Sequence, residues 1–286
     1  MITKVFENKL KEYNATNEME LQNVLQEIIQ QLVLNILSQS DFFSKAAFHG
    51  GTFLRLFHNM DRFSEDLDFV LKQPDKCFSW EDYFNFLKLK GREEGFDFAL
   101  IGKSDNDNAV KKTFLKTDSI GTFLNVEFPF AINQKRKIKI KLEIDSNPPL
   151  GSSYDTHYLS FPTIAAITTQ KMESSFASKS HALLCRQYVK GRDWYDFVWY
   201  VTKKQNIDFP LLKNALFQCG PWKGQDINVN RDWYLNALKN RIEDIDWKNA
   251  RTDVSRFLPA YRQKELDLWS VEFFLKQLSY LADSLP

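Results

Sequence analysis

Cysteine and histidine are scarce in this 286-residue sequence, with three and four copies. The cysteines, Cys77, Cys185 and Cys219, lie far apart and form no CxxC pair. This spacing argues against a zinc site or a disulfide framework and is typical of a reducing cytoplasm. No apolar run approaches the roughly 20 residues that span a bilayer, and residues 1–7 lack the apolar core of a secretory signal. We therefore expect a cytoplasmic protein with no membrane association.

The sequence also lacks an excess of charge of either sign. Its formal net charge is +1, so no global basic field indicates nucleic-acid binding, which has to come from local patches. The candidate patch consists of Lys111, Lys112, Lys116, Lys135, Arg136, Lys137, Lys139 and Lys141. These side chains suit nucleic-acid phosphates, but lysines that guard a solvated sheet edge explain them at least as well.

Two consecutive motifs carry the most chemical information. Residues 49–56 read His-Gly-Gly-Thr-Phe-Leu-Arg-Leu, and residues 62–69 read Arg-Phe-Ser-Glu-Asp-Leu-Asp-Phe. Glycines at the start of a helix let backbone N–H groups approach a phosphate closely. Asp66 and Asp68, two residues apart on a predicted strand, point to one face and can share a hard cation. A phosphate site with paired carboxylates is typical of metal-assisted nucleotidyl transfer, whereas two solvated aspartates on an edge strand are the structural alternative.

A second predicted strand, residues 137–145, alternates in the same way. Apolar side chains occupy the even positions 138 to 144, and charged side chains occupy the odd positions 139 to 145. If this strand neighbours the first, Glu143 completes a three-carboxylate site for one or two Mg²⁺ ions. Asp145 lies on the same face and competes with Glu143 for this role. An amphipathic strand with solvated charges is the alternative without a site.

Charged side chains also follow the spacing of two later predicted helices. Lys179 and Arg186, seven residues apart, lie on one helical face, where two cations can bind a polyphosphate. A solvated basic face is the alternative. Asp193 and Asp196 share a face of the next helix, although an aspartate in a first turn also suits the helix dipole without any chemistry.

Hydrophobic periodicity and chain breakers predict the order of the elements. Helices are expected at 18–39, 52–59, 80–90, 170–187, 192–203, 211–217, 231–241, 247–258 and 269–281. Strands are expected at 45–48, 67–71, 113–117, 122–128 and 137–145, and residues 158–167 form a strand or an extended lead-in. We place a boundary near residue 205, which gives a domain 1–205 and a helical region 206–286.

Together these motifs resemble the AbiEii/AbiGii-type toxin family of nucleotidyltransferases, a branch of the polymerase-β-like nucleotidyltransferase superfamily. The resemblance runs through residues 49–71 and continues at 141–144, in the place of the family's third acidic strand. It then includes Lys-x-x-Ala-x-x-x-Arg at 179–186 and Arg-Asp-x-x-Asp at 192–196. The resemblance implies an α+β fold, with a mixed β-sheet nucleotidyltransferase core flanked by helices and a helical C-terminal region.

The resemblance also implies roles for single residues. Mg²⁺ would be held by Asp66, Asp68 and Glu143, and nucleotide phosphates by Gly50, Gly51 and Thr52. Lys179 would contact the triphosphate, and Asp193 would complete the catalytic set; Lys171 competes with Lys179 but lacks the alanine and arginine at matching offsets. The remaining nucleotide-binding candidates are Arg55, Ser64, Arg186 and Asp196.

We therefore predict a cytoplasmic, Mg²⁺-dependent enzyme that transfers NMP from an NTP to a hydroxyl, with RNA such as a tRNA end as the expected acceptor. The resemblance implies the toxin of a toxin–antitoxin or abortive phage infection system, with a cognate antitoxin protein as partner. Two alternatives remain open. One is an NTP-binding protein without transfer activity that acts through a partner. The other is a transferase that modifies a protein or a small molecule.

Overall fold

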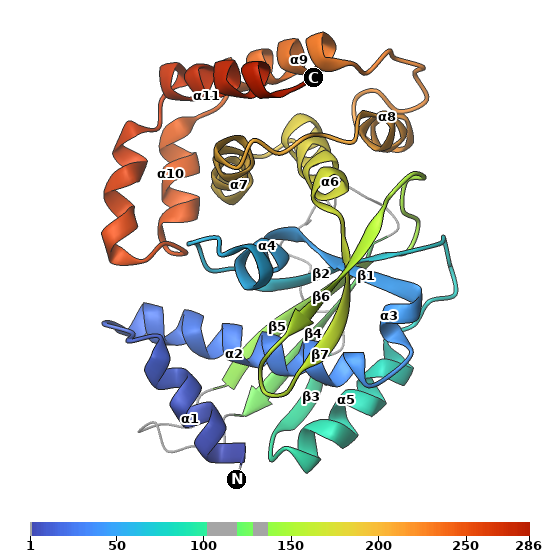
Figure 1. Ribbon diagram of the computed structural model, residues 1–286, viewed down its shortest axis with the longest axis vertical. Coiled ribbons are helices and arrows are strands. Elements are labelled where there is room, and N and C mark those ends of the chain that lie inside the picture. Colours follow the sequence, from blue (N-terminus) through green and yellow to red (C-terminus); the bar gives the residue numbers. More distant parts are fainter. Residues whose placement is uncertain (1, 102–118, 128–136) are drawn as a thin grey trace. The chain divides into compact units, whose positions relative to one another are not determined.

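The computed structural model describes residues 2–101, 119–127 and 137–286 (Figure 1). Backbone contacts divide the chain into two compact units. Unit 1 consists of Met1–Asn59, Phe63–Pro148 and Tyr154–Thr169, and unit 2 consists of Met60–Arg62, Pro149–Ser153 and Gln170–Pro286. The boundary that the sequence pattern places near residue 205 stays a prediction.

In the part of the chain that the structure describes, a seven-stranded sheet forms the centre of unit 1, in the order β3-β4-β5-β2-β1-β7-β6. The strands are β1 Ala46–His49, β2 Asp66–Leu71, β3 Asp97–Ile101, β4 Ser119–Glu127, β5 Lys137–Asp145, β6 Tyr154–Leu159 and β7 Ala165–Gln170. β2 is parallel to β5, and β1 is parallel to β7. The pairs β1/β2, β3/β4 and β4/β5 are antiparallel. The predicted mixed sheet is therefore confirmed.

The helices of unit 1 are α1 Ile2–Glu12, α2 Glu18–Ser38, α3 Phe42–Lys45, α4 Gly50–His58 and α5 Glu81–Glu93. The longest, α2, begins where the Asn17 side chain accepts a hydrogen bond from the Glu20 amide, as N-cap residues do. Its later turns are buried on nearly every side, from Val24 to Leu37. Its buried polar side chains have partners, as Gln30 and Asn35 show by donating to the backbone carbonyls of Ser64 and Thr163. A helix buried in this way belongs to a core, and α2 contacts both β5 and α5.

Unit 2 is built from helices α6 Met172–Cys185, α7 Gly191–Thr202, α8 Phe209–Gln218, α9 Arg231–Glu243, α10 Trp247–Ser255 and α11 Val271–Ser284, with the 3₁₀ helix η1 Ala260–Leu268. Gly191 lets α7 approach α10 closely, because a Cβ at this position would lie 1.8 Å from the Ala250 carbonyl oxygen. The ring of Trp247 stacks on Phe274 with centroids 3.8 Å apart. Trp194 on α7 packs against both of these rings. These contacts hold α7, which carries two of the candidate aspartates, in the core of its unit.

The sequence missed four elements, α1, α3, β3 and η1, and merged two others. Residues 158–167, expected as one extended segment, contain the end of β6 and the start of β7. Pro162 lies between these strands, and a proline cannot donate to a sheet ladder. The predicted strand at 113–117 and the basic residues Lys111, Lys112, Lys116, Lys135 and Arg136 lie outside the described residues.

None of the helices in the described ranges has the length and apolar content that a membrane span requires.

Candidate active site

Three acidic side chains lie on one face of two neighbouring strands in unit 1. In the parallel register of β2 and β5, Asp68 is opposite Glu143, and Asp66 is opposite Lys141. The other face of β2 is apolar, since Leu67 and Phe69 are buried. The predicted neighbourhood of the two strands is therefore confirmed, and we call Asp66, Asp68 and Glu143 the acidic site.

The start of α4 lies against this site. His49, the last residue of β1, pairs with Asp68 in the antiparallel register. The next residue, Gly50, has φ +80°, and a Cβ built there would lie 2.5 Å from the Oδ2 atom of Asp68. Only glycine combines this backbone conformation with so close a carboxylate. The diglycine turn and the second aspartate are therefore neighbours in space, with the N-terminus of α4 beside the acidic site.

Other candidate nucleotide residues in unit 1 have partners within the protein. Thr52 is fully buried, and its hydroxyl donates to the carbonyl oxygen of Asp66. The Nε atom of Arg55 lies 2.8 Å from a carboxylate oxygen of Glu27. Ser64 accepts a hydrogen bond from the Gln30 amide through its backbone carbonyl, at 2.9 Å. These contacts fix the segment around Asp66, and the predicted phosphate contacts of Thr52, Arg55 and Ser64 stay predictions.

The oxygen ligands of the acidic site suit a hard divalent cation such as Mg²⁺. Lys141 forms an ion pair with Glu143. Burial lowers the pKa of Lys141, but Asp66, Glu143 and Asp68 outweigh this effect and raise the pKa above its ordinary value. Three carboxylates and one ammonium leave two negative charges in excess. Within the described residues, no three acidic, histidine or cysteine side chains already surround one metal position. To bind a cation, Glu143 would have to break its ion pair with Lys141.

The structure separates the two rivals for the third carboxylate. Glu143 is opposite Asp68, whereas Asp145 is opposite Val70, two residues further along β2. Asp145 is buried, and its Oδ1 atom accepts a hydrogen bond from the Asn147 amide at 3.2 Å. Glu143 therefore lies directly beside Asp68 in the register, and Asp145 is the last residue of its strand. The role of Glu143 as the third carboxylate stays a prediction.

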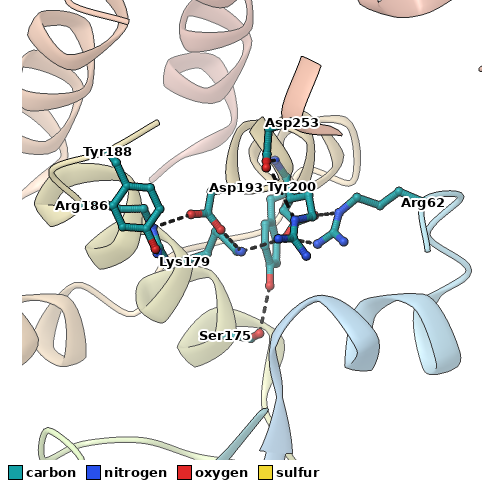
Figure 2. Close-up of polar contacts among 10 residues, drawn as sticks. Arg62, Ser175, Lys179, Arg186, Tyr188, Asp193, Tyr200 and Asp253 are labelled. Carbon is teal, nitrogen blue, oxygen red and sulfur yellow. Dashed lines mark hydrogen bonds and ion pairs between the residues drawn. The ribbon is translucent and has the colours of Figure 1, made fainter. Parts of the chain in front are cut away.

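The candidate cations and aspartates of unit 2 pair with one another (Figure 2). Lys179 on α6 lies 2.7 Å from Asp193 and 2.8 Å from Asp196, both on α7. The Nε atom of Arg186, which follows α6, is 3.0 Å from the second oxygen of Asp193. Arg62 contacts Asp196 at 2.6 Å. We call these five residues the ion chain. The alternative of a solvated basic face for Lys179 and Arg186 is wrong, because both are largely buried and paired, whereas the rival Lys171 is exposed.

The two aspartates of the ion chain are held as carboxylates. Burial raises the pKa of Asp193, but Lys179, Arg186 and Lys190 outweigh burial, and the pKa lies well below its ordinary value. Burial also raises the pKa of Asp196, and Arg62 and Lys179 reverse that effect. Lys179 in turn has a raised pKa, since Asp193 and Asp196 more than compensate for its desolvation. All members of the ion chain are therefore charged near neutral pH.

Sequence reasoning gave no role to Arg62, the first residue of the motif at 62–69. Its partner Asp196 is 134 residues away in the sequence, so no local spacing connects the two. The signal in the sequence was weaker: Arg62 is followed by the apolar Phe63 and lies two residues after Met60, both of which the structure buries. A charge buried among such residues requires a partner.

The sequence model of the family described as "Nucleotidyl transferase AbiEii toxin, Type IV TA system" matches residues 31–277. The chain belongs to this family. It is therefore an AbiEii nucleotidyltransferase toxin of the type IV toxin–antitoxin class. The family and the toxin role are those that the resemblance implied. No curated protein matches the chain significantly.

Two solved structures share the AbiEii fold seen here. MenT4, a nucleotidyltransferase toxin from Mycobacterium tuberculosis H37Rv, has a TM-score of 0.54 and 18% sequence identity, and the match covers 98% of this chain and 99% of that chain. JHP933 from Helicobacter pylori has a TM-score of 0.51 and 17% identity, with 92% of this chain and 90% of that chain covered. At these identities the likeness shows the fold alone, and it confirms the predicted α+β class.

Proposed function

We propose that this AbiEii nucleotidyltransferase is Mg²⁺-dependent and transfers NMP from an NTP to a hydroxyl of RNA, with a tRNA end as acceptor. In this reaction the hydroxyl oxygen bonds to the α-phosphorus, the bond from that phosphorus to the bridging oxygen breaks, and pyrophosphate leaves. The hydroxyl proton passes to a base or to water. A cytoplasmic location, where NTP and tRNA occur together, is part of this proposal, as is a cognate antitoxin protein.

The observation that carries the proposal is the position of Asp68. This residue lies opposite Glu143 in the register of β2 and β5, and it lies against Gly50 at the start of α4. Asp66, Asp68 and Glu143 would hold the metal, and the amides of Gly50 and Gly51 at the start of α4 would bind phosphate. Bound Mg²⁺ supplies neutralisation of the charge that develops on the triphosphate and on the attacking oxygen. Asp145 then has a structural role.

The ion chain supports a phosphate-binding role for unit 2. It contains three cations, Arg62, Lys179 and Arg186, against two carboxylates, Asp193 and Asp196. A buried group of charges with a cation in excess favours an additional anion. We therefore assign the triphosphate contact to Lys179, with Arg186 as the second cation. Asp193 would hold both cations, and Asp196 would hold Lys179.

Labelling with each of the four NTPs tests the transfer. The purified protein is incubated with α-labelled NTP, Mg²⁺ and total RNA, and the label is followed on RNA, protein and small molecules. Label on RNA of tRNA size supports the proposal. NTP binding without any labelled product would favour a protein that transfers nothing and acts through a partner. Label on protein or on a small molecule would show that the acceptor is not RNA but a molecule of that kind.

Asp66→Ala tests the metal assignment within the same assay. We expect transfer to be lost while the protein stays folded, because Asp66 is half-buried at the start of β2. Asp97→Ala is the matched control, since Asp97 is an exposed aspartate at the start of β3 in the same sheet. Near wild-type turnover by Asp66→Ala would contradict the assignment.

A further inference from the structure

Arg62 is buried in unit 2 although it carries a permanent charge. It is 2% exposed and is among the largest fully buried side chains of the described residues. A buried guanidinium is tolerated only where it is paired and hydrogen-bonded. The partner of Arg62 therefore indicates what this residue does.

Arg62 and Asp196 form a two-point fork. The Nε atom of Arg62 donates to Oδ1 of Asp196 at 2.6 Å, and Nη2 donates to Oδ2 at 2.7 Å. Such a planar fork matches a carboxylate in a way that a lysine ammonium cannot. Arg62 alone therefore pairs with both oxygens of the fully buried Asp196, without any contribution from Lys179.

Lys179 occupies the middle of the ion chain. Its Nζ atom is 2.7 Å from Oδ1 of Asp193 and 2.8 Å from Oδ2 of Asp196. Each of these carboxylates also has an arginine, Arg186 for the first and Arg62 for the second. If Lys179 moves to another anion, neither carboxylate is left as an unpaired buried charge. Without Arg62, by contrast, Asp196 would retain Lys179 as its counter-ion, because an uncompensated buried charge is strongly unfavourable.

We propose that Arg62 is a positioning residue for Lys179. Arg62 neutralises Asp196, so that the ammonium of Lys179 can exchange from the carboxylates onto a nucleotide phosphate. This inference rests on the proposed function, in which Lys179 binds the triphosphate. It assigns Arg62 no contact with the nucleotide.

The competing explanation is that Arg62 only anchors the segment 60–62 to its unit. The same segment offers a matched control, because Asp61 has its own ion pair with Arg262, at 2.6 Å. Arg262→Met removes this anchor and leaves Asp196 and Lys179 unchanged. This pair is far more exposed than the pair of Arg62 with Asp196, so the variant tests whether a weaker hold on the segment alters nucleotide binding at all. A purely anchoring role predicts that Arg62→Met raises Kd by the same factor with or without Lys179.

A double-mutant cycle between Arg62 and Lys179 tests the proposal. The Kd of a non-hydrolysable NTP analogue with Mg²⁺ is measured by calorimetry for the wild type, Arg62→Met, Lys179→Met and the double variant. We expect Arg62→Met to raise Kd about tenfold in the wild-type background and less than about twofold in the Lys179→Met background, as for coupled neighbours. Arg262→Met should leave Kd unchanged, and urea denaturation reports the stability of each variant separately.

Equal effects of Arg62→Met in the two backgrounds would overturn the proposal, since Arg62 would then act independently of Lys179. A rise of Kd in Arg262→Met as large as in Arg62→Met would also overturn it, in favour of the anchoring role. If Arg62→Met does not fold, the cycle is run with Arg62→Lys, which keeps the charge but loses the fork, and a smaller non-additivity of the same sign is expected. A wild-type protein that binds none of the four NTP analogues contradicts the proposed function itself, a result distinct from additivity in the cycle.

Discussion

The backbone of Gly50 lies against the carboxylate of Asp68. A Cβ at position 50 would be 2.5 Å from Oδ2, and the φ of +80° is one that side chains other than glycine rarely adopt. Gly50→Ala should therefore displace Asp68 and lower transfer activity about 100-fold, the effect of a misplacement of about 1 Å at a reacting centre. Initial rates of NMP transfer at saturating Mg²⁺ measure this effect.

Gly95→Ala separates backbone strain from displacement of the carboxylate. Gly95 has a similar φ of +85°, but a Cβ there would meet nothing within 4 Å. We expect this variant to lose about 1 kcal/mol of stability from the left-handed conformation and to keep its activity. Equal activity losses in the two glycine variants would show that strain alone, and not Asp68, accounts for the effect of Gly50→Ala.

The choice between Glu143 and Asp145 as third carboxylate makes a second prediction. Glu143→Gln should lower transfer activity and raise the Mg²⁺ concentration needed for half-maximal activity, because it removes a ligand opposite Asp68. Asp145→Asn should mainly lower the free energy of unfolding, since Asp145 is buried and accepts from the Asn147 amide. A Mg²⁺ titration of both variants decides the matter, and a shifted Mg²⁺ requirement only in Asp145→Asn would reverse the assignment.

The acidic site could be predicted from the sequence in outline because strand alternation is a local signal. The period-2 pattern of β2 and β5 places Asp66, Asp68 and Glu143 on charged faces without any tertiary information. Contacts between distant segments decide that the two strands pair, and they set the register in which Glu143, and not Asp145, lies opposite Asp68. Only the structure supplies this register.

The ion chain shows the opposite case. The predicted shared helical face of Lys179 and Arg186 is wrong, because α6 ends at Cys185 and Arg186 follows it in extended conformation. The two cations instead meet at the carboxylate of Asp193, a partner that the sequence could not distinguish from water. Arg62, far away along the chain, was missed for the same reason. Local patterns locate charged faces, and burial decides whether such a face is solvated or paired.

The ion chain also predicts how stability depends on pH. Burial raises the pKa values of Asp193 and Asp196, but Lys179, Arg186 and Arg62 reverse the effect and lower both. A depressed pKa in the folded state contributes stability that is present above the unfolded value of about 4 and is lost as the pH falls through the folded value. We therefore expect the free energy of unfolding to fall steadily as the pH is lowered below about 5.

Asp196→Asn checks the origin of this acid sensitivity. It leaves Arg62 without its buried partner and should cost about 3–5 kcal/mol near neutral pH, with a smaller further loss in acid than the wild type shows. Asp253→Asn, which removes a more exposed carboxylate 3.9 Å from Arg192, is the control and should keep the wild-type slope. Urea denaturation followed by tryptophan fluorescence across the pH range gives both quantities, and an unchanged acid slope in Asp196→Asn would contradict the explanation.

Lys141 competes with a cation for the acidic site. It pairs with Glu143, and its pKa is raised, since Asp66, Glu143 and Asp68 outweigh the effect of burial. Lys141→Met should therefore lower the Mg²⁺ concentration for half-maximal transfer about two- to fivefold, the size of an ion pair worth up to about 1 kcal/mol. Lys139→Met, an exposed position two residues earlier on β5, should leave this concentration unchanged. A higher Mg²⁺ requirement in Lys141→Met would mean that the ammonium helps to assemble the site rather than competing for it, because removing a simple competitor can only favour the cation.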